Sequence, residues 1–236
     1  DPGLTVSDVD NANLTGATVQ ITSGLASSED SLGFVDQLGI TGTYNAGTGI
    51  LTLSGTASVA DYETALRSVT YTNSSEIPDT TNRDISFQVS DGLAVAGGSR
   101  TVSVASINDD PTNAGSLPTD VTVTEDSMNS IDLSSFVLQD VDASNQLVSV
   151  TLTTGTGGRI TASSDFDVMV YGSGTGTMTL VGGVSDLNNF FSSTTRFWYQ
   201  HGTQHTAGDN ADTITVTAND GGNTGTGGGG TIALGT

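Results

Sequence analysis

The sequence contains no cysteine and no lysine, and apolar residues are scarce in it. Without cysteine, neither a disulfide framework nor a zinc-thiolate site can form. All five basic residues are arginines, against 26 acidic residues, so the net charge is −21. Nucleic acids and anionic membrane surfaces bind clustered positive charge, which this composition does not provide. Hydrophobic residues make up 34% of the chain, without an apolar run of about 18 residues. These absences predict no nucleic-acid binding and no membrane insertion.

Motifs of catalysis are also missing. No nucleophilic side chain stands beside a base in a recognisable pair, no glycine-rich phosphate loop lies between a strand and a helix, and no cofactor motif occurs. We therefore expect that the protein is not an enzyme.

The chain repeats itself at an offset of about 130 residues. Three segments recur in the same order, which chance does not readily produce. They are Leu4–Leu14 with Phe136–Leu147, Gly47–Leu53 with Gly174–Leu180, and Arg83–Gly92 with Ala211–Gly221. The sequence thus predicts two related domains, residues 1–107 and residues 108–236, which meet at the segment INDDPT.

Most segments of both repeats alternate apolar and polar residues, as in Ile85, Phe87 and Val89. That period of two is typical of half-buried antiparallel strands, and Gly, Asn and Asp between the segments supply tight turns. Each repeat has one helical exception. The first is SVADYETALRS, with Ser58 as a candidate N-cap, and the second is VSDLNNFFSS. The predicted fold is all-β: two tandem Greek-key β-sandwich domains, each with one short helix.

The two repeats differ in length at their start. About thirty residues separate Asp110 from the Asp-Val-Asp motif of the second repeat, whereas seven residues precede that motif in the first. Residues 120–135, DVTVTEDSMNSIDLSS, therefore have no partner in the first repeat. We expect the first domain to lack its N-terminal strand. A domain so shortened leaves a sheet edge or core groove open, and we expect β-strand addition there from a neighbouring repeat or subunit.

Acidic residues follow several of the predicted strands. Asp140 and Asp142 follow one strand of the second repeat and Asp220 another, at the end where the INDDPT segment enters the domain. Glu76 and Asp79 lie in a loop at the exit end of the first repeat. Carboxylates this close need a cation, and Ca²⁺, which takes about 6–8 oxygen ligands, suits them best. The predicted ligands of this inter-domain calcium are Asn108, Asp109, Asp110, Asp140, Asp142 and Asp220, with Glu76 and Asp79.

Two stretches resemble bacterial cadherin-like repeats, which occur in tandem in giant calcium-dependent surface adhesins of the RTX type. They are LRSVTYTNSSEIPDTTNRDISFQVSDG and ANDGGNTGTGGGGT, and the resemblance covers nearly the whole chain. It implies a cadherin- or immunoglobulin-like sandwich, bound calcium, and a location outside the cell or on the bacterial cell surface.

The resemblance also assigns ligands. INDDP matches the acidic linker, Asp140 and Asp142 match the D-x-D motif, and Ala218-Asn219-Asp220 matches A-x-D. Glu125 matches the acidic residue of the first strand and implies a calcium site at the C-terminal end. The counterparts Asp8, Asp10 and Asp91 imply a further calcium site at the N-terminal end of the first repeat.

We interpret the chain as calcium-rigidified extender repeats of an extracellular adhesin, which project an adhesive element from the cell. Two alternatives stay open. The chain is a subunit of a filament or matrix assembled by β-strand donation, or it is a carbohydrate-binding module. The second rests on Trp198, which strand alternation places outward with Arg196 while Phe197 and Tyr199 face the core, because an outward Trp can stack on a sugar.

Overall fold

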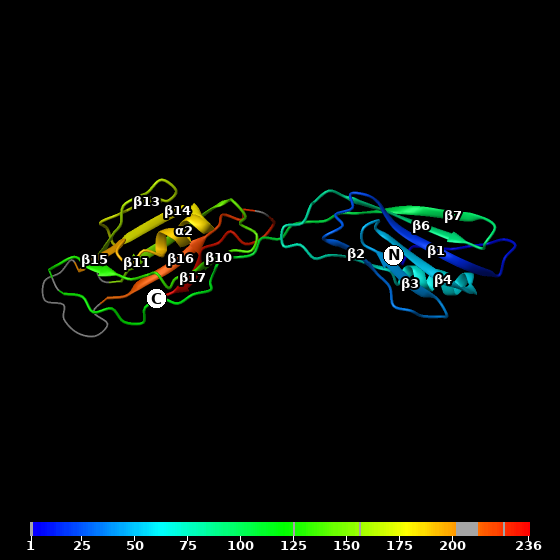
Figure 1. Cartoon of the computed structure of the whole chain (residues 1–236), viewed down its shortest axis with the longest axis horizontal. Helices are drawn as coiled ribbons and strands as arrows, with labels where there is room; N and C mark the ends of the chain where they lie inside the picture. Colours follow the sequence, from blue (N-terminus) through cyan, green and yellow to red (C-terminus); the bar gives the residue numbers. More distant parts are fainter. Residues whose placement is uncertain (1, 125, 156, 202–211, 224) are drawn as a thin grey trace. The chain divides into compact units, whose positions relative to one another are not determined.

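The computed structural model describes residues 2–124, 126–155, 157–201, 212–223 and 225–236. Contacts divide the chain into two compact units, of which unit 1 ends at Ser106 and unit 2 begins at Ile107, one residue before the predicted boundary. Within the described residues, each unit consists of antiparallel strands and one short helix (Figure 1). The all-β class is therefore confirmed, while the Greek-key sandwich arrangement stays a prediction.

Unit 1 contains a five-stranded sheet and a separate pair of strands. The order is β3-β4-β1-β6-β7 in the sheet, and β2 pairs with β5. The elements are β1 (Asn13–Ser23), β2 (Asp30–Gly33), β3 (Thr41–Asn45), β4 (Ile50–Ser58), α1 (Val59–Arg67), β5 (Thr70–Asn73), β6 (Arg83–Ser90) and β7 (Val95–Val102).

Unit 2 repeats the five-stranded sheet, with the order β13-β14-β11-β16-β17. Its second sheet has three strands, β12-β15-β9, and a short pair joins β10 to β8. The elements are β8 (Thr112–Asn113), β9 (Asn129–Ile131), β10 (Leu138–Gln139), β11 (Leu147–Thr154), β12 (Gly158–Thr161), β13 (Met169–Tyr171), β14 (Thr177–Gly183), α2 (Val184–Phe191), β15 (Phe197–His201), β16 (Ile214–Asn219) and β17 (Ile232–Gly235).

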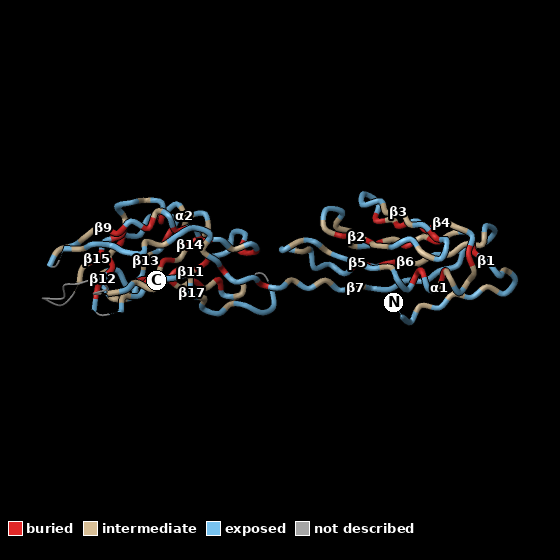
Figure 2. The backbone as a smooth tube through the Cα atoms, turned by 90° about the horizontal axis from the view of Figure 1, so that it is seen from below, coloured by how far each residue is buried: buried red, intermediate tan, exposed pale blue. Residues whose placement is uncertain are grey.

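Alternation of apolar residues forms the core of each unit. In β11, Val148, Val150 and Leu152 are buried while the residues between them are not, as the sequence predicts for a strand with one face inward. Figure 2 shows buried residues alternating with more exposed ones along the strands of both units. In each unit a single apolar cluster takes side chains from both the larger and the smaller sheet.

The two helices sit at matching places, between β4 and β5 in unit 1 and between β14 and β15 in unit 2. Helix α1 begins at the predicted cap: the Ser58 side chain accepts the Asp61 N–H, and the Asp61 carboxylate accepts the Ser58 N–H. Tyr62, Ala65 and Leu66 form its buried face, as predicted. Helix α2 begins at Gly183, which offers no side-chain cap.

The smaller sheets differ by one strand. In unit 2, β9 lies beside β15 (Figure 2) and pairs with it. In this register Ile131 lies opposite Phe197. In unit 1, β5 corresponds to β15, and among the described residues it pairs only with β2. The free edge of β5 is at the position where the sequence predicts a missing strand.

Candidate metal centre

The strongest candidate site lies at the start of unit 2, where three loops meet. Asp140 and Asp142 follow β10, and Asp220 follows β16. The third loop carries Asn108, whose N–H donates to the carbonyl of Thr226 (3.3 Å). The D-x-D motif, the A-x-D motif and the first residues of unit 2 are thereby gathered in one place, as the sequence predicts.

Hydrogen bonds tie these loops together directly. The Asn108 Nδ2 donates to Oδ2 of Asp220 (2.7 Å), and the Asp109 N–H donates to Oδ2 of Asp142 (3.2 Å). Within the D-x-D motif, Oδ1 of Asp140 accepts the N–H groups of Asp142 (3.3 Å) and Ala143 (2.9 Å). The carboxylates are therefore fixed in place by neutral donors.

Burial makes this cluster electrostatically costly. Asp142 is 0% exposed and Asp220 2% exposed. Asn108 is 6% exposed, and its Oδ1 has no hydrogen-bond partner among the described residues, nor has the buried Oδ2 of Asp140. Burial, and next to it the carboxyl of Asp142, raises the pKa of Asp140 to about 6. Oxygen lone pairs and negative charge are thus concentrated where water has little access.

The described side chains of the cluster do not form a complete metal coordination site. Among the described residues, no group of three or more His, Cys, Asp or Glu side chains is placed to hold a metal ion. Asp109 and Asp110 are exposed. Glu125 lies outside the described residues. The donors that are gathered, carboxylate and amide oxygens, nevertheless suit a hard cation such as Ca²⁺.

The predicted N-terminal site of unit 1 has a different character. Oδ1 of Asp8 accepts the N–H groups of Asp10 (3.1 Å) and Asn11 (2.9 Å), and the Asn11 Nδ2 donates to Oδ2 of Asp91 (2.7 Å). Asp8 and Asp91 are half-buried and Asp10 is exposed. Backbone hydrogen bonds, from Asn11 to Asp8 and from Ala94 to Asp91, hold the pKa of both carboxyls below their usual value. Neutral donors therefore stabilise the charged form of both carboxylates, and a calcium site at Asp8, Asp10 and Asp91 stays a prediction.

Asp79, a predicted calcium ligand, is engaged inside unit 1. Its Oδ1 accepts the Thr81 N–H (2.8 Å) and lies 3.9 Å from Nη1 of Arg83. Glu76, the other predicted ligand in this loop, is exposed. The structure therefore gives Asp79 a local role in its own loop, and the calcium role of these two residues stays a prediction.

Arg83 belongs to a buried polar network that the sequence analysis missed. Its Nε donates to Oδ2 of Asp30 (2.9 Å) and its Nη2 to Oδ1 (3.2 Å), and both side chains are 0% exposed. The Tyr71 hydroxyl and the Asn73 Nδ2 also donate to Oδ1 of Asp30 (2.6 and 2.9 Å). One signal was available: Arg83 has the same strand parity as the inward-facing Ile85.

Trp198 lies outward, as predicted, and is 37% exposed, whereas Phe197 and Tyr199 are buried. Its neighbour Arg196 is engaged, because Nη1 lies 2.7 Å from Oδ2 of Asp165 and the guanidinium sits 4.2 Å from the centre of the Phe190 ring. Stacking of a ligand on Trp198 and Arg196 stays a prediction.

Comparisons with known proteins give one partial relative. Halomucin of Haloquadratum walsbyi is 43% identical over 98 residues, which are 39% of this chain and 1% of that protein. No family model matches the chain. One solved structure, described as manganese lipoxygenase of Gaeumannomyces graminis with a partial structure of zonadhesin of Komagataella pastoris, covers 99% of this chain and 83% of its own at 10% identity. Its TM-score is 0.25, too low to carry an argument. Neither described helix is long and apolar enough to cross a membrane.

Proposed function

We propose that the chain forms calcium-stabilised extender domains of an extracellular surface protein with an adhesive role. The observation that carries the proposal is the cluster of Asn108, Asp140, Asp142 and Asp220, with two buried carboxylates and two buried oxygens that lack a hydrogen-bond partner among the described residues. A bound cation would neutralise the two buried carboxylates and coordinate the two oxygens that lack a hydrogen-bond partner. The partial likeness to halomucin supports a location outside the cell, on its surface.

In this proposal, Asp142 and Asp220 supply buried carboxylate oxygens and Asn108 supplies its amide oxygen. Asp140 adds its Oδ2, and the exposed Asp109 and Asp110 complete the set. Because Asn108 and Asp109 are the second and third residues of unit 2, a cation held there fixes the incoming chain to the unit. A chain of such domains then resists bending better with calcium than without it.

Calcium titration with unit-specific melting tests the proposal. Trp198, the single tryptophan, reports on unit 2 alone. We expect calorimetric calcium binding, and a rise of several degrees in the tryptophan-monitored melting temperature over that in EGTA. Asp142→Asn should abolish both effects. Asp167→Asn, which removes the same charge from an exposed position, should retain them.

The extender role has its own readout. Small-angle scattering of the whole chain should show a narrower range of dimensions in calcium than in EGTA, and Asp142→Asn should remove the difference. Scattering and melting curves that do not change with calcium would contradict the proposal. Calcium binding without any change in scattering would leave a calcium protein that is not a stiffened extender.

A further inference from the structure

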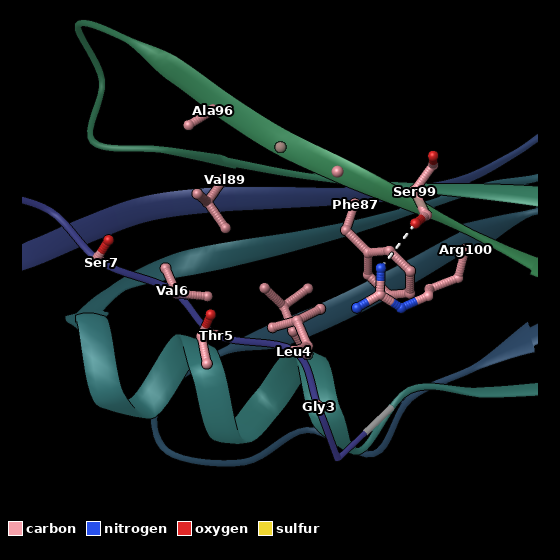
Figure 3. A pocket seen from close by; sticks show the side chains of 13 residues that line it. Gly3, Leu4, Thr5, Val6, Ser7, Phe87, Val89, Ala96, Ser99 and Arg100 are labelled. Atoms are coloured by element: carbon pink, nitrogen blue, oxygen red, sulfur yellow. Dashed lines mark hydrogen bonds between the residues drawn. The ribbon is translucent and has the colours of Figure 1, made fainter.

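Unit 1 has an apolar groove beside the free edge of β5. Residues from both sheets line this open groove, which has a volume of about 330 Å³: Val19, Leu32, Val69, Thr70, Tyr71, Ile85, Phe87, Arg100 and Val102. A second hollow of about 310 Å³ adjoins it at Phe87 and Arg100, between the N-terminal segment and the strands β6 and β7. Figure 3 shows Leu4 and Val6 on that segment, beneath Phe87 and Val89.

Core residues along the groove are less covered than their counterparts in unit 2. Val69 and Phe87 are half-buried. The repeat aligns them with Phe197 and Val216, which are 0% and 2% exposed. Apolar side chains of one repeat are thus left partly in contact with water where the other repeat buries them fully, and covering them would be favourable.

Unit 2 shows what covers these positions. Its β9 lies on the edge of β15, with Ile131 opposite Phe197 and Asn129 opposite Tyr199. Ile131 and Leu133 are buried in its core. They belong to residues 120–135, the stretch for which the first repeat has no counterpart.

The chain just after this stretch occupies the same place in both units. In unit 2, the Leu138 N–H donates to Oδ1 of Asn188 in α2 (2.8 Å). In unit 1, the Val6 N–H donates to Oε2 of Glu63 in α1 (3.0 Å). Val6 and Leu138 also match in the sequence repeat. The N-terminal segment of unit 1 therefore stands in for β10, and the position of β9 beside β5 is left uncovered by the described residues.

We propose that the open groove of unit 1 accepts, as an added antiparallel strand on β5, a strand of the kind that residues 129–135 provide in unit 2. The donor places apolar residues at the spacing of Ile131 and Leu133 into the groove. Its backbone pairs with β5 in the register of β9 on β15, so that the position of Ile131 lies opposite Val69 and that of Ser130 opposite Thr70.

A register-specific disulfide tests the proposal on the full chain. The chain has no cysteine of its own, and Thr70 is exposed. A synthetic peptide of residues 120–135 carrying Ser130→Cys should cross-link to the Thr70→Cys chain under oxidising thiol buffer, because directly opposed strand residues lie within disulfide reach. The same peptide with its cysteine at position 127 should react at least about tenfold more slowly. Equal cross-linking rates for the two peptides would overturn the proposed strand register.

Binding without a cross-link gives a second measurement. Labelled peptide should bind the chain with a Kd of about micromolar order, at high salt that screens the charges of peptide and protein. Val69→Asp, at the groove wall, should weaken binding at least about tenfold, while Val35→Asp, at a position 79% exposed and away from the groove, should leave it unchanged. A peptide with Asp at positions 131 and 133 should not bind. Failure of the unaltered peptide to bind would overturn the proposal, whatever the result with calcium.

Discussion

The larger sheets of the two units have the same strand order, but their smaller sheets and their buried charges differ. Unit 2 covers its core with β9, whereas one edge of β5 in unit 1 has no partner strand among the described residues. Unit 2 buries carboxylates among neutral donors, whereas unit 1 buries a carboxylate against a guanidinium. Unit 2 thus covers its apolar layer and holds its buried carboxylates with neutral hydrogen-bond donors. Unit 1 pairs its buried carboxylate with an arginine, and its described residues leave part of its apolar layer exposed.

The polar networks beside the smaller sheets show the same divergence. The repeat aligns Arg83 with Asp212, and β-pairing aligns Asp30 with Gly158 at the start of the matching strand. In unit 2, the Tyr199 hydroxyl donates to Oδ2 of Asp212 (2.7 Å). A Cβ on Gly158 would lie 2.4 Å from that oxygen, so no side chain fits where unit 1 has Asp30. The same strand framework therefore accepts either an ion pair or a carboxylate held by a hydroxyl.

The largest expected effect comes from removing the guanidinium of unit 1. Arg83→Ala leaves Asp30 buried without its counter-charge, and breaking a buried pair costs about 3–5 kcal/mol. Calorimetry should show the unit 1 transition far below its original temperature, with the Trp198-monitored transition of unit 2 in place. Arg159→Ala, at an exposed arginine of unit 2, should leave the transition temperatures of both units unchanged. A small loss in Arg83→Ala would mean that water or another cation reaches Asp30.

Acid should affect the two units in opposite directions. The pKa of Asp140 is raised to about 6, so its neutral form stabilises unit 2 below the unfolded pKa of about 3.9, and this contribution is lost as the pH rises through about 6. In EGTA, the melting temperature of unit 2 should therefore rise by a few degrees between pH 7.5 and 5. Calcium should remove the rise.

Unit 1 should lose stability in acid at lower pH. Burial acts to raise the pKa of Asp30, but its hydrogen bonds, led by that from Arg83, outweigh burial and hold the pKa below the usual value. Its stabilising contribution is present above about pH 3.9 and is lost as the pH falls through the lowered value. Unit 1 should melt at the same temperature at pH 7.5 and 5, and lower at pH 3. Melting temperatures that change with pH in the same way in both units would contradict this difference between their buried carboxylates.

Monovalent salt gives a smaller, shared effect. Unit 1 has 12 acidic residues and three arginines, whereas unit 2 has 14 acidic residues and two arginines. Self-repulsion of this charge opposes folding, and salt screens it. Sodium chloride should raise both melting temperatures in EGTA, unit 2 more than unit 1. A melting temperature that falls with salt in either unit would show that attractive surface pairs outweigh repulsion there.

The sequence allowed the local structure to be predicted better than the partners of charged residues. Alternation places Phe197 inward and Trp198 outward, and capping places the start of α1 at Ser58, because both depend on near neighbours. The meeting of Asn108 with Asp220 also follows from strand order, since loops at one end of antiparallel strands converge. The Asp30–Arg83 pair cannot be predicted from the sequence. Its members are 53 residues apart, and the inward position of an arginine does not indicate which acidic residue it pairs with. For the same reason the sequence does not reveal the contact of Asp79 with Arg83, and a calcium role of Asp79 stays a prediction.

Exchanging the helix caps gives the smallest expected effect and the finest test of equivalence between the units. Ser58→Ala removes the capping box of α1 and should cost about 1 kcal/mol, seen as a lower unit 1 transition. In unit 2, the cap position is Gly183, whose φ of −65° and ψ of 156° nearly match the −64° and 156° of Ser58.

Gly183→Ser should therefore place a hydroxyl where Asp186, the third helical residue, can complete the same box. The added Cβ would lie 3.1 Å from Oδ2 of Asp186, at the end of a side chain that can turn aside. Serine also restricts the unfolded chain more than glycine does. We expect a gain of about 0.5 kcal/mol in unit 2, measured by the Trp198 transition, with Gly183→Ala as the control that adds the Cβ without the hydroxyl. An equal gain in both variants would assign the effect to the unfolded state, and a loss in Gly183→Ser would show that the two helix starts are not equivalent.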